Sequence, residues 1–367
     1  MASVRTPRGI IPILPLKGRG ATSNRPPRFD AWDRDLDRDF ADRALSDEPP
    51  PNPRTQVTEQ AARTIISRNQ SPDVPFDQSV NPFQGCEHGC VYCYARPTHA
   101  YLGLSPGLDF ETRLYAKTNA AELLAKELRK PGHVPSLIAL GANTDPYQPI
   151  ERRFEITRSI LRVLSDFNHP VGITTKSALV ERDFDILKPM AAKGLARVFV
   201  SITTLDHELA RRMEPRANAP TRRLQTVRAL ADAGIPVGVL VAPVIPALTD
   251  HELEAVLEAS ANAGADNAGY VMLRLPLEVR DLFVEWLEAN YPLRARHVMS
   301  LVRQLRDGRD NDPTFNNRMR GTGKFAELIR QRFAIACRRL KLNARDSTLD
   351  TSLFAVPPPA DGQLALF

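Results

Sequence analysis

The chain has 367 residues, of which 43% are hydrophobic and 25% are charged, and its net charge is +6 at pH 7. This composition is ordinary for a globular protein, and the longest apolar runs fall short of the roughly 20 residues that cross a bilayer. Four cysteines are too few for a disulfide scaffold, so we expect a cytoplasmic protein whose clustered thiols are metal ligands or catalytic groups. The small positive surplus permits a polyanionic partner but does not require one.

We expect four segments along the chain. Residues 1–70 alternate Asp with Arg, show little apolar periodicity and end in a proline cluster, which predicts an irregular, partly disordered extension. The sequence does not decide whether this extension wraps over the globular part. A core over residues 75–276 follows, then a helical region over residues 277–345 and a flexible, proline-containing tail over residues 346–367.

Within the core, short apolar runs alternate with amphipathic stretches of helix length. The predicted strands cover residues 76–83, 136–142, 170–176, 196–204, 236–244 and 268–276. The predicted helices lie near residues 119–130, 152–167, 182–193, 220–233 and 249–264, with Asn119 and Thr249 as N-caps and Gly194, Gly234 and Gly264 at helix ends. This alternation indicates an α/β fold with a parallel sheet. Six units in order favour a partial TIM-type (β/α)6 open barrel, which the sequence separates only weakly from a doubly wound sheet.

The stretch GCEHGCVYCYA, residues 85–95, contains three of the four cysteines, Cys86, Cys90 and Cys93. Zinc usually takes four ligands in two pairs, and no second pair is present here, although His88 or His99 could complete a Cys3His site. Three thiolates on one loop can instead hold three irons of a cubane cluster and leave the fourth iron open to a ligand. The spacing alone leaves both kinds of site open.

The C-x3-C-x2-C loop, with Tyr92 before its last cysteine, resembles the radical S-adenosylmethionine (SAM) superfamily. The longer string NPFQGCEHGCVYCYARPTHAYLGLSPGLDFET is similar to a bacterial branch related to spore photoproduct lyase, the DNA repair photolyase-like proteins, over roughly residues 75–340. The resemblance implies that the three cysteines bind a 4Fe–4S cluster and that SAM chelates its open iron. It further implies that an electron from a flavodoxin- or ferredoxin-type donor cleaves SAM to methionine and a 5′-deoxyadenosyl radical, which abstracts hydrogen from a substrate.

Polar residues that follow two of the predicted strands are candidate SAM contacts. Asn143, Thr144 and Asp145 would accept hydrogen bonds from the amino group of SAM, with an ordinary turn as the alternative. Lys176 would pair with the carboxylate of SAM and Ser177 with a ribose hydroxyl. The alternative for this pair is a solvated lysine and a helix N-cap.

Three further features complete the candidate SAM site. Ser201 is polar within an apolar strand, so it would contact the ribose or be satisfied by the backbone. Tyr92 would lie against the adenine. The arginine-rich segment of residues 210–228 could meet a carboxylate or phosphate, but a solvated helix face accounts for most of it.

The substrate is not named by the resemblance. Spore photoproduct lyase uses a further cysteine between the cluster loop and mid-barrel as hydrogen donor, whereas this chain has no cysteine between Cys93 and Cys337. Cys337 lies in a predicted C-terminal helix, where we expect a small buried hydrophobe. The basic pI of about 9.2 tilts the choice of substrate towards DNA or another nucleic acid.

The terminal QLALF resembles the short peptide by which bacterial polymerases and repair proteins dock on the DNA sliding clamp. Gln363 would donate or accept a hydrogen bond, and Leu364, Leu366 and Phe367 would fill an apolar groove, with the proline-containing spacer as a tether. The alternative is a tail that packs on its own domain. Two functional classes follow from the sequence: a radical SAM enzyme, or a zinc-stabilised nucleic-acid-binding or interaction module without radical chemistry.

Overall fold

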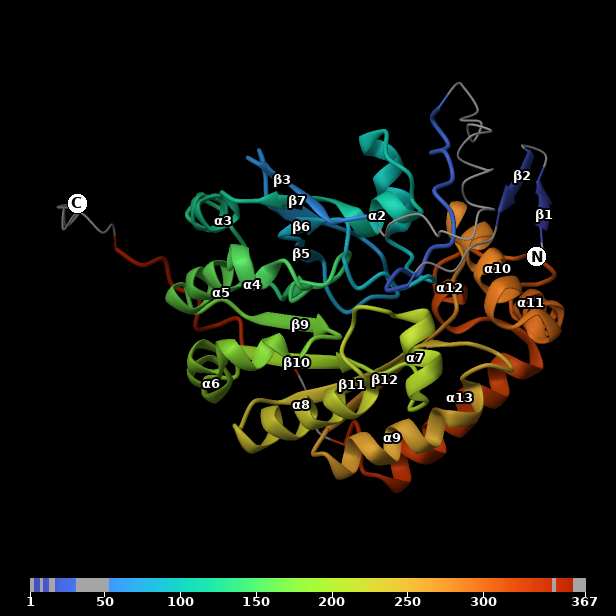
Figure 1. Ribbon diagram of the computed structural model, residues 1–367. Coiled ribbons are helices and arrows are strands. Elements are labelled where there is room, and N and C mark those ends of the chain that lie inside the picture. The colour runs from blue at the N-terminus through green and yellow to red at the C-terminus, as the bar shows by residue number, and fades with distance from the viewer. Residues whose placement is uncertain (1–2, 7–8, 13–16, 31–52, 345–347, 359–367) are drawn as a thin grey trace.

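The computed structural model describes residues 3–6, 9–12, 17–30, 53–344 and 348–358, and Figure 1 shows a curved sheet whose outer side is covered by helices. The main sheet has seven strands. In chain order they are β4 (Ile66–Arg68), β5 (Gln78–Val80), β8 (Ile138–Leu140), β9 (Val171–Thr175), β10 (Ala196–Ser201), β11 (Val237–Val244) and β12 (Asn267–Met272). Each of the six predicted strands is therefore confirmed.

The order of the strands is that of an open barrel. From β5 through β8 to β12, each strand of this sheet pairs in parallel with the sheet's next strand along the chain, and β4 pairs antiparallel with β5 at one edge. A doubly wound sheet would reverse its strand order at a switch point, and this sheet has no reversal. The carboxyl ends of the six parallel strands therefore meet at one edge, where a barrel of this type has its ligands.

Helices follow the strands as predicted. They are α3 (Ala120–Leu128), α4 (Glu151–Phe154), α5 (Ile156–Asp166), α6 (Phe184–Ala192), α8 (Pro220–Asp232) and α9 (Leu253–Asn262). Gly194, Gly234 and Gly264 have positive φ angles just past α6, α8 and α9, as expected for helix ends.

Asn119 and Thr249 occupy the N-cap positions of α3 and of a 3-10 helix (Asp250–Glu252), but neither side chain makes a capping hydrogen bond. The side chain of Asn119 exchanges hydrogen bonds with the backbone N and O of Ala62 instead of capping α3. The hydroxyl of Thr249 accepts from the backbone N of Ile245, not from a following helix. Both polar side chains are used by segments that precede them, because tertiary contacts compete with local caps for the same oxygen.

Four helices follow the sheet: α10 (Glu278–Asn290), α11 (Pro292–Gln304), the short α12 (Asn317–Arg320) and α13 (Gly323–Arg339). They lie in the region that the sequence predicts to be helical. Cys337 is buried on α13, and burial raises the pKa of its thiol to about 11. Residues 348–358 pack back on the core, since Ala355 donates to the carbonyl of Phe167. The proposed clamp-docking residues of the tail lie outside the described residues.

The segment before residue 70 has more regular structure than predicted. β1 (Ser3–Thr6) and β2 (Gly9–Pro12) form an antiparallel pair, and β3 (Gln56–Gln60) pairs in parallel with β7 (Arg113–Lys117), which also pairs with β6 (Phe83–Gln84). The side chains of β3 are mostly exposed, so this strand forms by backbone pairing. Its sequence has no apolar pattern that would predict a strand.

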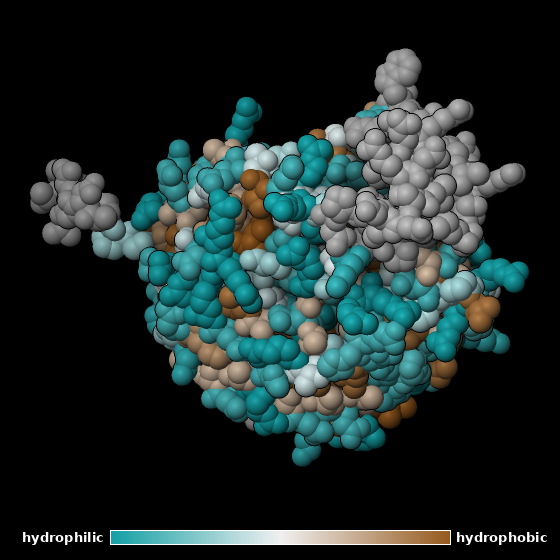
Figure 2. All heavy atoms as spheres, in the orientation of Figure 1, coloured by the Kyte–Doolittle hydropathy of each residue, from teal (hydrophilic) through white to brown (hydrophobic). Residues whose placement is uncertain are grey.

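The surface is polar over most of one face. Figure 2 shows hydrophilic residues across the visible face, with apolar residues in small separate patches. Within the described ranges no helix has the length and apolar character needed to cross a membrane. The apolar residues lie instead in a core between the sheet and its helices, and in a second core where α10 and α11 pack against residues 90–92.

Candidate functional site

The cluster loop, residues 85–95, leaves β6 and lies against residues that follow β8 and β9, so it sits at the carboxyl edge of the sheet. Its cysteines Cys86, Cys90 and Cys93 form no disulfide. Burial raises the pKa of all three thiols, to about 12 for Cys90. Thiolates here therefore need a positively charged centre. Three thiols without a disulfide, of which those of Cys86 and Cys90 are buried and that of Cys93 is half-buried, fit three irons of an iron–sulfur cluster.

Arg96 holds the cluster loop in shape. This side chain is fully buried, its Nε donates to the carbonyl of Cys90 at 2.9 Å, and its Nη2 donates to the carbonyl of Gly89 at 3.2 Å. Its guanidinium also forms an ion pair with the buried carboxylate of Glu111. Arg96 is thus occupied by the protein itself and positions the backbone that carries the cysteines.

Within the N-terminal extension, residues 17–30 cover the cluster loop. The backbone N atoms of Gly20 and Ala21 donate to the Glu111 carboxylate at 3.0 and 2.8 Å. A Cβ on Gly20 would lie 1.8 Å from the carbonyl oxygen of Gly89, so only glycine allows this approach. Further along, Ser23 donates to the Glu285 carboxylate of α10 at 2.6 Å.

The loop that follows β8 carries the residues predicted to accept from the amino group of SAM. Thr144 donates to the carbonyl of Phe83 at 2.9 Å. Asp145 accepts from the Thr175 hydroxyl at 2.7 Å and from the backbone N of Lys176 at 2.8 Å, and its Oδ2 lies 3.3 Å from Nδ1 of His88. Thr144 and Asp145 therefore already have partners within the protein.

The charge state of Asp145 follows from these contacts. Burial would raise the pKa of this carboxyl, but the His88 ring and the hydrogen bonds from Thr175 and Lys176 lower it below the usual value. Asp145 is therefore ionised and joins the cluster loop to the end of β9. The backbone N of Asn143 donates to the Asn81 side chain at 3.1 Å, which fixes the start of the same loop.

Lys176 and Ser201 come together at the ends of β9 and β10. Nζ of Lys176 donates to the Ser201 hydroxyl at 3.0 Å and lies 5.9 Å from the ring centroid of Tyr92. Ser201 in turn donates to the carbonyl of Ala242 at 3.3 Å. Among the described residues no carboxylate lies within ion-pair distance of Lys176. Ser177, by contrast, accepts from the backbone N of Leu179 and caps a short 3-10 helix.

A buried polar network that the sequence did not predict supports this corner. The Tyr92 hydroxyl and the Thr203 hydroxyl both contact the carboxylate of Glu214, Thr203 at 2.7 Å. Glu214 forms an ion pair with Arg223, whose Nη1 donates to the carbonyl of Ser201 at 3.0 Å. The network connects the cluster loop to the end of β10.

Charge compensation keeps Glu214 ionised. Burial would raise the pKa of Glu214, but the charges of Arg223 and Lys176 outweigh it and lower this pKa to about 2. The pKa of the Tyr92 hydroxyl is raised well above its usual value by burial and by Glu214, so the phenol is neutral. The ring of Tyr92 is consequently fixed between a carboxylate and a lysine.

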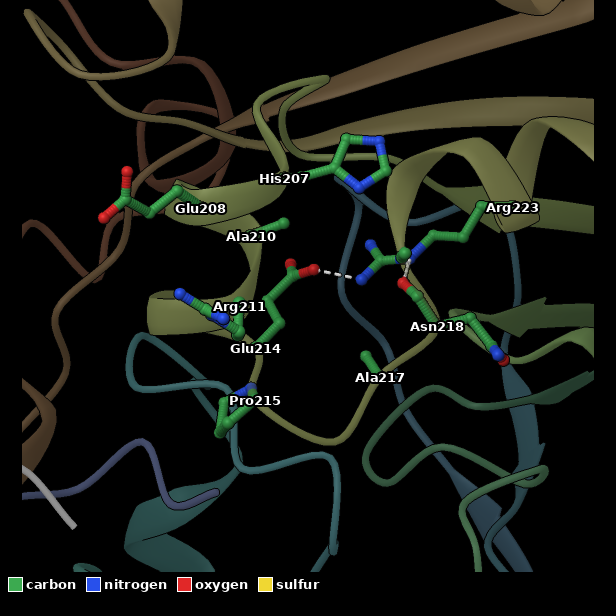
Figure 3. Close-up of a pocket in the computed structure, with 10 residues that line it drawn as sticks. His207, Glu208, Ala210, Arg211, Glu214, Pro215, Ala217, Asn218 and Arg223 are labelled. Atoms are coloured by element: carbon green, nitrogen blue, oxygen red, sulfur yellow. Dashed lines mark hydrogen bonds and ion pairs between the residues drawn. The ribbon is translucent and has the colours of Figure 1, made fainter. Parts of the chain in front are cut away.

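A pocket of about 610 Å³ opens beside this network. Figure 3 shows Glu214 and Arg223 pointing toward one another in it, between α7 (His207–Met213) and the start of α8. Its lining is His207, Glu208, Ala210, Arg211, Glu214, Pro215, Ala217, Asn218, Ala219 and Arg223. The pocket adjoins the cluster loop, because the carbonyl of Met213 accepts from the backbone N of Val91 at 3.0 Å.

Each of the two histidines that could complete a zinc site has one ring nitrogen in contact with the protein. Nδ1 of His88 faces Asp145, and Nε2 of His99 contacts the carbonyl of Arg113 at 2.9 Å. Over the described part of the chain no group of three or more His, Cys, Asp or Glu side chains is arranged to hold a metal ion.

Comparison with known proteins identifies the family. The model of the radical SAM superfamily matches residues 80–259. Uncharacterized proteins of Mycobacterium tuberculosis and Mycobacterium bovis are 37% identical over 292 residues, which cover 78% of this chain and 82% of theirs. An uncharacterized protein of Methanocaldococcus jannaschii is 27% identical over 241 residues, 66% of this chain and 86% of that protein. The chain belongs to the radical SAM superfamily.

A solved structure shares the fold. A variant of spore photoproduct lyase matches with a TM-score of 0.54 and 16% identity, over 77% of this chain and 79% of that chain. The protein is therefore a radical SAM enzyme built on a partial barrel, and the cofactors of its superfamily are a 4Fe–4S cluster and SAM. Enzymes of this superfamily take their electron from a reductant of the flavodoxin or ferredoxin type.

Proposed function

We propose that the protein generates a 5′-deoxyadenosyl radical at Cys86, Cys90 and Cys93 and directs it at a nucleic acid. The position of Lys176 is the observation that supports the generation of the radical. Its ammonium group lies at the carboxyl edge of the sheet beside the cluster loop, and its hydrogen-bond partner is the neutral hydroxyl of Ser201. A cation that has no carboxylate partner in the described part of the protein can form an ion pair with the carboxylate of SAM.

The residues of the chain then have separate roles. When bound, the cluster and SAM supply the electron transfer and the radical chemistry. Lys176 pairs with the SAM carboxylate, Ser201 contacts a ribose hydroxyl, and the fixed ring of Tyr92 lies against the adenine. Asn143 is the remaining acceptor for the amino group, since Thr144 and Asp145 are used by the protein. The segment of residues 17–30 excludes water from the cluster loop.

The charge and the fold support a nucleic acid as the substrate. The net charge is +6, and the shared fold is that of an enzyme named for its action on a spore photoproduct. Repair of that photoproduct is not what we propose, because the hydrogen-donating cysteine of that family has no counterpart here. Cys337 is buried on α13 and is separated from Cys93 by the whole barrel sequence.

Anaerobic reconstitution tests the proposal. Full-length protein supplied with iron and sulfide should become brown, and with SAM and dithionite it should release 5′-deoxyadenosine, more rapidly when ultraviolet-irradiated DNA is added. Cys90→Ala should lose the cluster absorbance and the product, whereas Cys337→Ala should retain both. Stoichiometric zinc without 5′-deoxyadenosine would contradict the radical reaction, and a rate indifferent to every nucleic acid tried would contradict the substrate.

A further inference from the structure

A second cationic position lies at the carboxyl edge of the sheet, on the side of β12. Arg274 follows this strand, and its guanidinium carbon is 5.3 Å from the ring centroid of Tyr94. Tyr94 is the residue directly after Cys93 and is held by a hydrogen bond from its hydroxyl to the carbonyl of Ala142. Arg274 therefore lies beside the cluster loop without belonging to the contacts assigned to SAM.

Arg274 has no charge partner in the described part of the chain. Its Nε is buried without a hydrogen-bond partner, and its Nη1 has only the sulfur of Met319 at 3.6 Å. Burial, and then the charge of Arg318, lower the pKa of Arg274. A half-buried guanidinium with open donors is costly unless an anion completes it, and its planar fork matches a phosphate or a carboxylate.

The surroundings of Arg274 are cationic and aromatic. Arg318 lies 4.7 Å from the ring centroid of Phe315 and is paired with the carboxylate of Asp73. Arg306, whose pKa is lowered to about 10 by burial and then by Arg274, donates to the carbonyls of Leu273 and Asn317. Tyr94 and Phe315 are 46% and 48% exposed as whole residues. Arginines interleaved with exposed aromatic rings are typical of surfaces that bind single-stranded nucleic acid.

We propose that Arg274 binds a backbone phosphate of the nucleic-acid substrate, with Tyr94 and Phe315 as surfaces for unstacked bases beside the cluster loop. This inference rests on the proposed function and adds the subsite that presents the substrate. The exposed rings favour a nucleic acid over an acidic peptide, which would need the cations alone. Arg318 forms an ion pair with Asp73, so it contributes mainly to the local electrostatic potential and makes no direct phosphate contact.

The first test is binding of a fluorescein-labelled, mixed-sequence 12-nucleotide single-stranded DNA to anaerobically reconstituted protein, followed by anisotropy at several salt concentrations. Arg274→Gln should weaken binding about tenfold and reduce the slope of log K against log salt by about one. The control is Arg330→Gln, which removes the same charge from an exposed residue of α13 that is paired with Glu327. It should change the affinity less than twofold.

A second variant works in the opposite direction, so that a folding defect cannot imitate it. Asp73→Asn should keep the hydrogen bond from the backbone N of Asn316 and release Arg318, so the affinity for the same DNA should rise several-fold. The inference would be overturned if Asp73→Asn did not raise the affinity for DNA, or if Arg274→Gln and Arg330→Gln lowered that affinity equally. Displacement of the DNA by polyglutamate at equal charge concentration would overturn it in favour of an acidic protein partner.

Two further outcomes separate this inference from the proposed function. If Arg274→Gln weakens the affinity for SAM, measured by anaerobic titration calorimetry, and leaves DNA binding intact, Arg274 is a SAM contact and the inference fails. If wild-type protein releases no 5′-deoxyadenosine, the proposed function fails, and the binding results still report on the phosphate subsite.

Discussion

At the scale of single residues, Lys176 differs from Arg96 and Arg223, two buried arginines near the cluster loop. Arg96 and Arg223 are each paired with a buried carboxylate, whereas Lys176 donates to a hydroxyl. Arg96 and Arg223 therefore hold the protein together, and Lys176 remains available to a bound anion. The charge of Lys176 also helps to keep Glu214 ionised, so it serves the site before any ligand binds.

Lys176→Met should therefore weaken SAM binding roughly 10- to 100-fold, the effect of losing a hydrogen bond to a charged group. The reconstituted variant should keep its iron, because the Lys176 side chain makes no hydrogen bond or ion pair with the cluster loop. Equilibrium dialysis with SAM measures the effect, and Lys126→Met, at an exposed position of α3, is the control. Equal affinities for the two variants would show that the carboxylate binds elsewhere.

The site residues show what the sequence could and could not predict. Cys86, Cys90 and Cys93 stand in one short motif, and Lys176 and Ser201 each follow or end an apolar run, so their meeting at one edge could be expected. Glu214 and Arg223 stand in no motif, and their pairing depends on burial between α7 and α8, which a sequence does not display. Tyr92 is predicted to lie against the adenine, and the sequence does not indicate that its hydroxyl contacts Glu214.

At the scale of secondary-structure elements, burial decided what could be predicted. The strands β5, β8, β10 and β11 are mostly buried on both faces, and β9 and β12 are buried in part. All six contain apolar runs, which is why the sequence predicts them. β3 is exposed and residues 17–30 have no regular structure, so neither has a hydrophobic period. The cover over the cluster loop depends on backbone donors at Gly20 and Ala21, which any sequence possesses.

This covering segment gives a prediction about Gly20. In Gly20→Ala the new Cβ would collide with the carbonyl of Gly89, which belongs to the cluster loop and cannot yield as a flexible side chain could. The segment should therefore lift, and the cluster should be exposed to oxygen. We expect the 4Fe–4S absorbance of reconstituted protein to bleach several-fold faster in air than in the wild type.

The matched control for Gly20→Ala is Gly172→Ala. Gly172 lies within β9, its backbone is not in the left-handed region, and an added Cβ would meet the Leu137 side chain at an ordinary 3.4 Å. Its rate of bleaching should stay close to that of the wild type. Equal bleaching of Gly20→Ala and wild type would show that residues 17–30 do not shield the cluster.

At the scale of the whole molecule, the two edges of the sheet differ in chemistry. The carboxyl edge has the cysteines, the Lys176–Ser201 contact and the Glu214–Arg223 pair. The other edge is closed by the C-terminal segment, where Phe354 packs against Phe167, His133 and His169. The residues of the candidate site thus lie at one edge, and the opposite edge holds the end of the described chain against the core.

The closed edge makes the stability of the protein depend on pH through His169. Nε2 of His169 lies 3.4 Å from Nε2 of His133, and burial lowers the pKa of His169 to about 4, from 6.5 in an unfolded chain. The unfolded state therefore binds more protons between these values, so the stability contributed by neutral His169 is complete above pH 6.5 and is lost as the pH falls towards 4. Between pH 7 and pH 5 this group alone should remove about 2 kcal/mol from the free energy of unfolding.

The comparison of wild type with His169→Gln isolates this effect, because any loss of the cluster in acid affects both proteins equally. Urea unfolding at pH 7 and pH 5 should show a steeper fall for the wild type, and the difference between the two falls should be about 2 kcal/mol. His133, whose pKa is also lowered by burial, remains in both proteins and cancels to first order. If the free energy of unfolding decreased equally in the two proteins, His169 would accept its proton without disturbing Phe354. The closed edge would then tolerate an imidazolium.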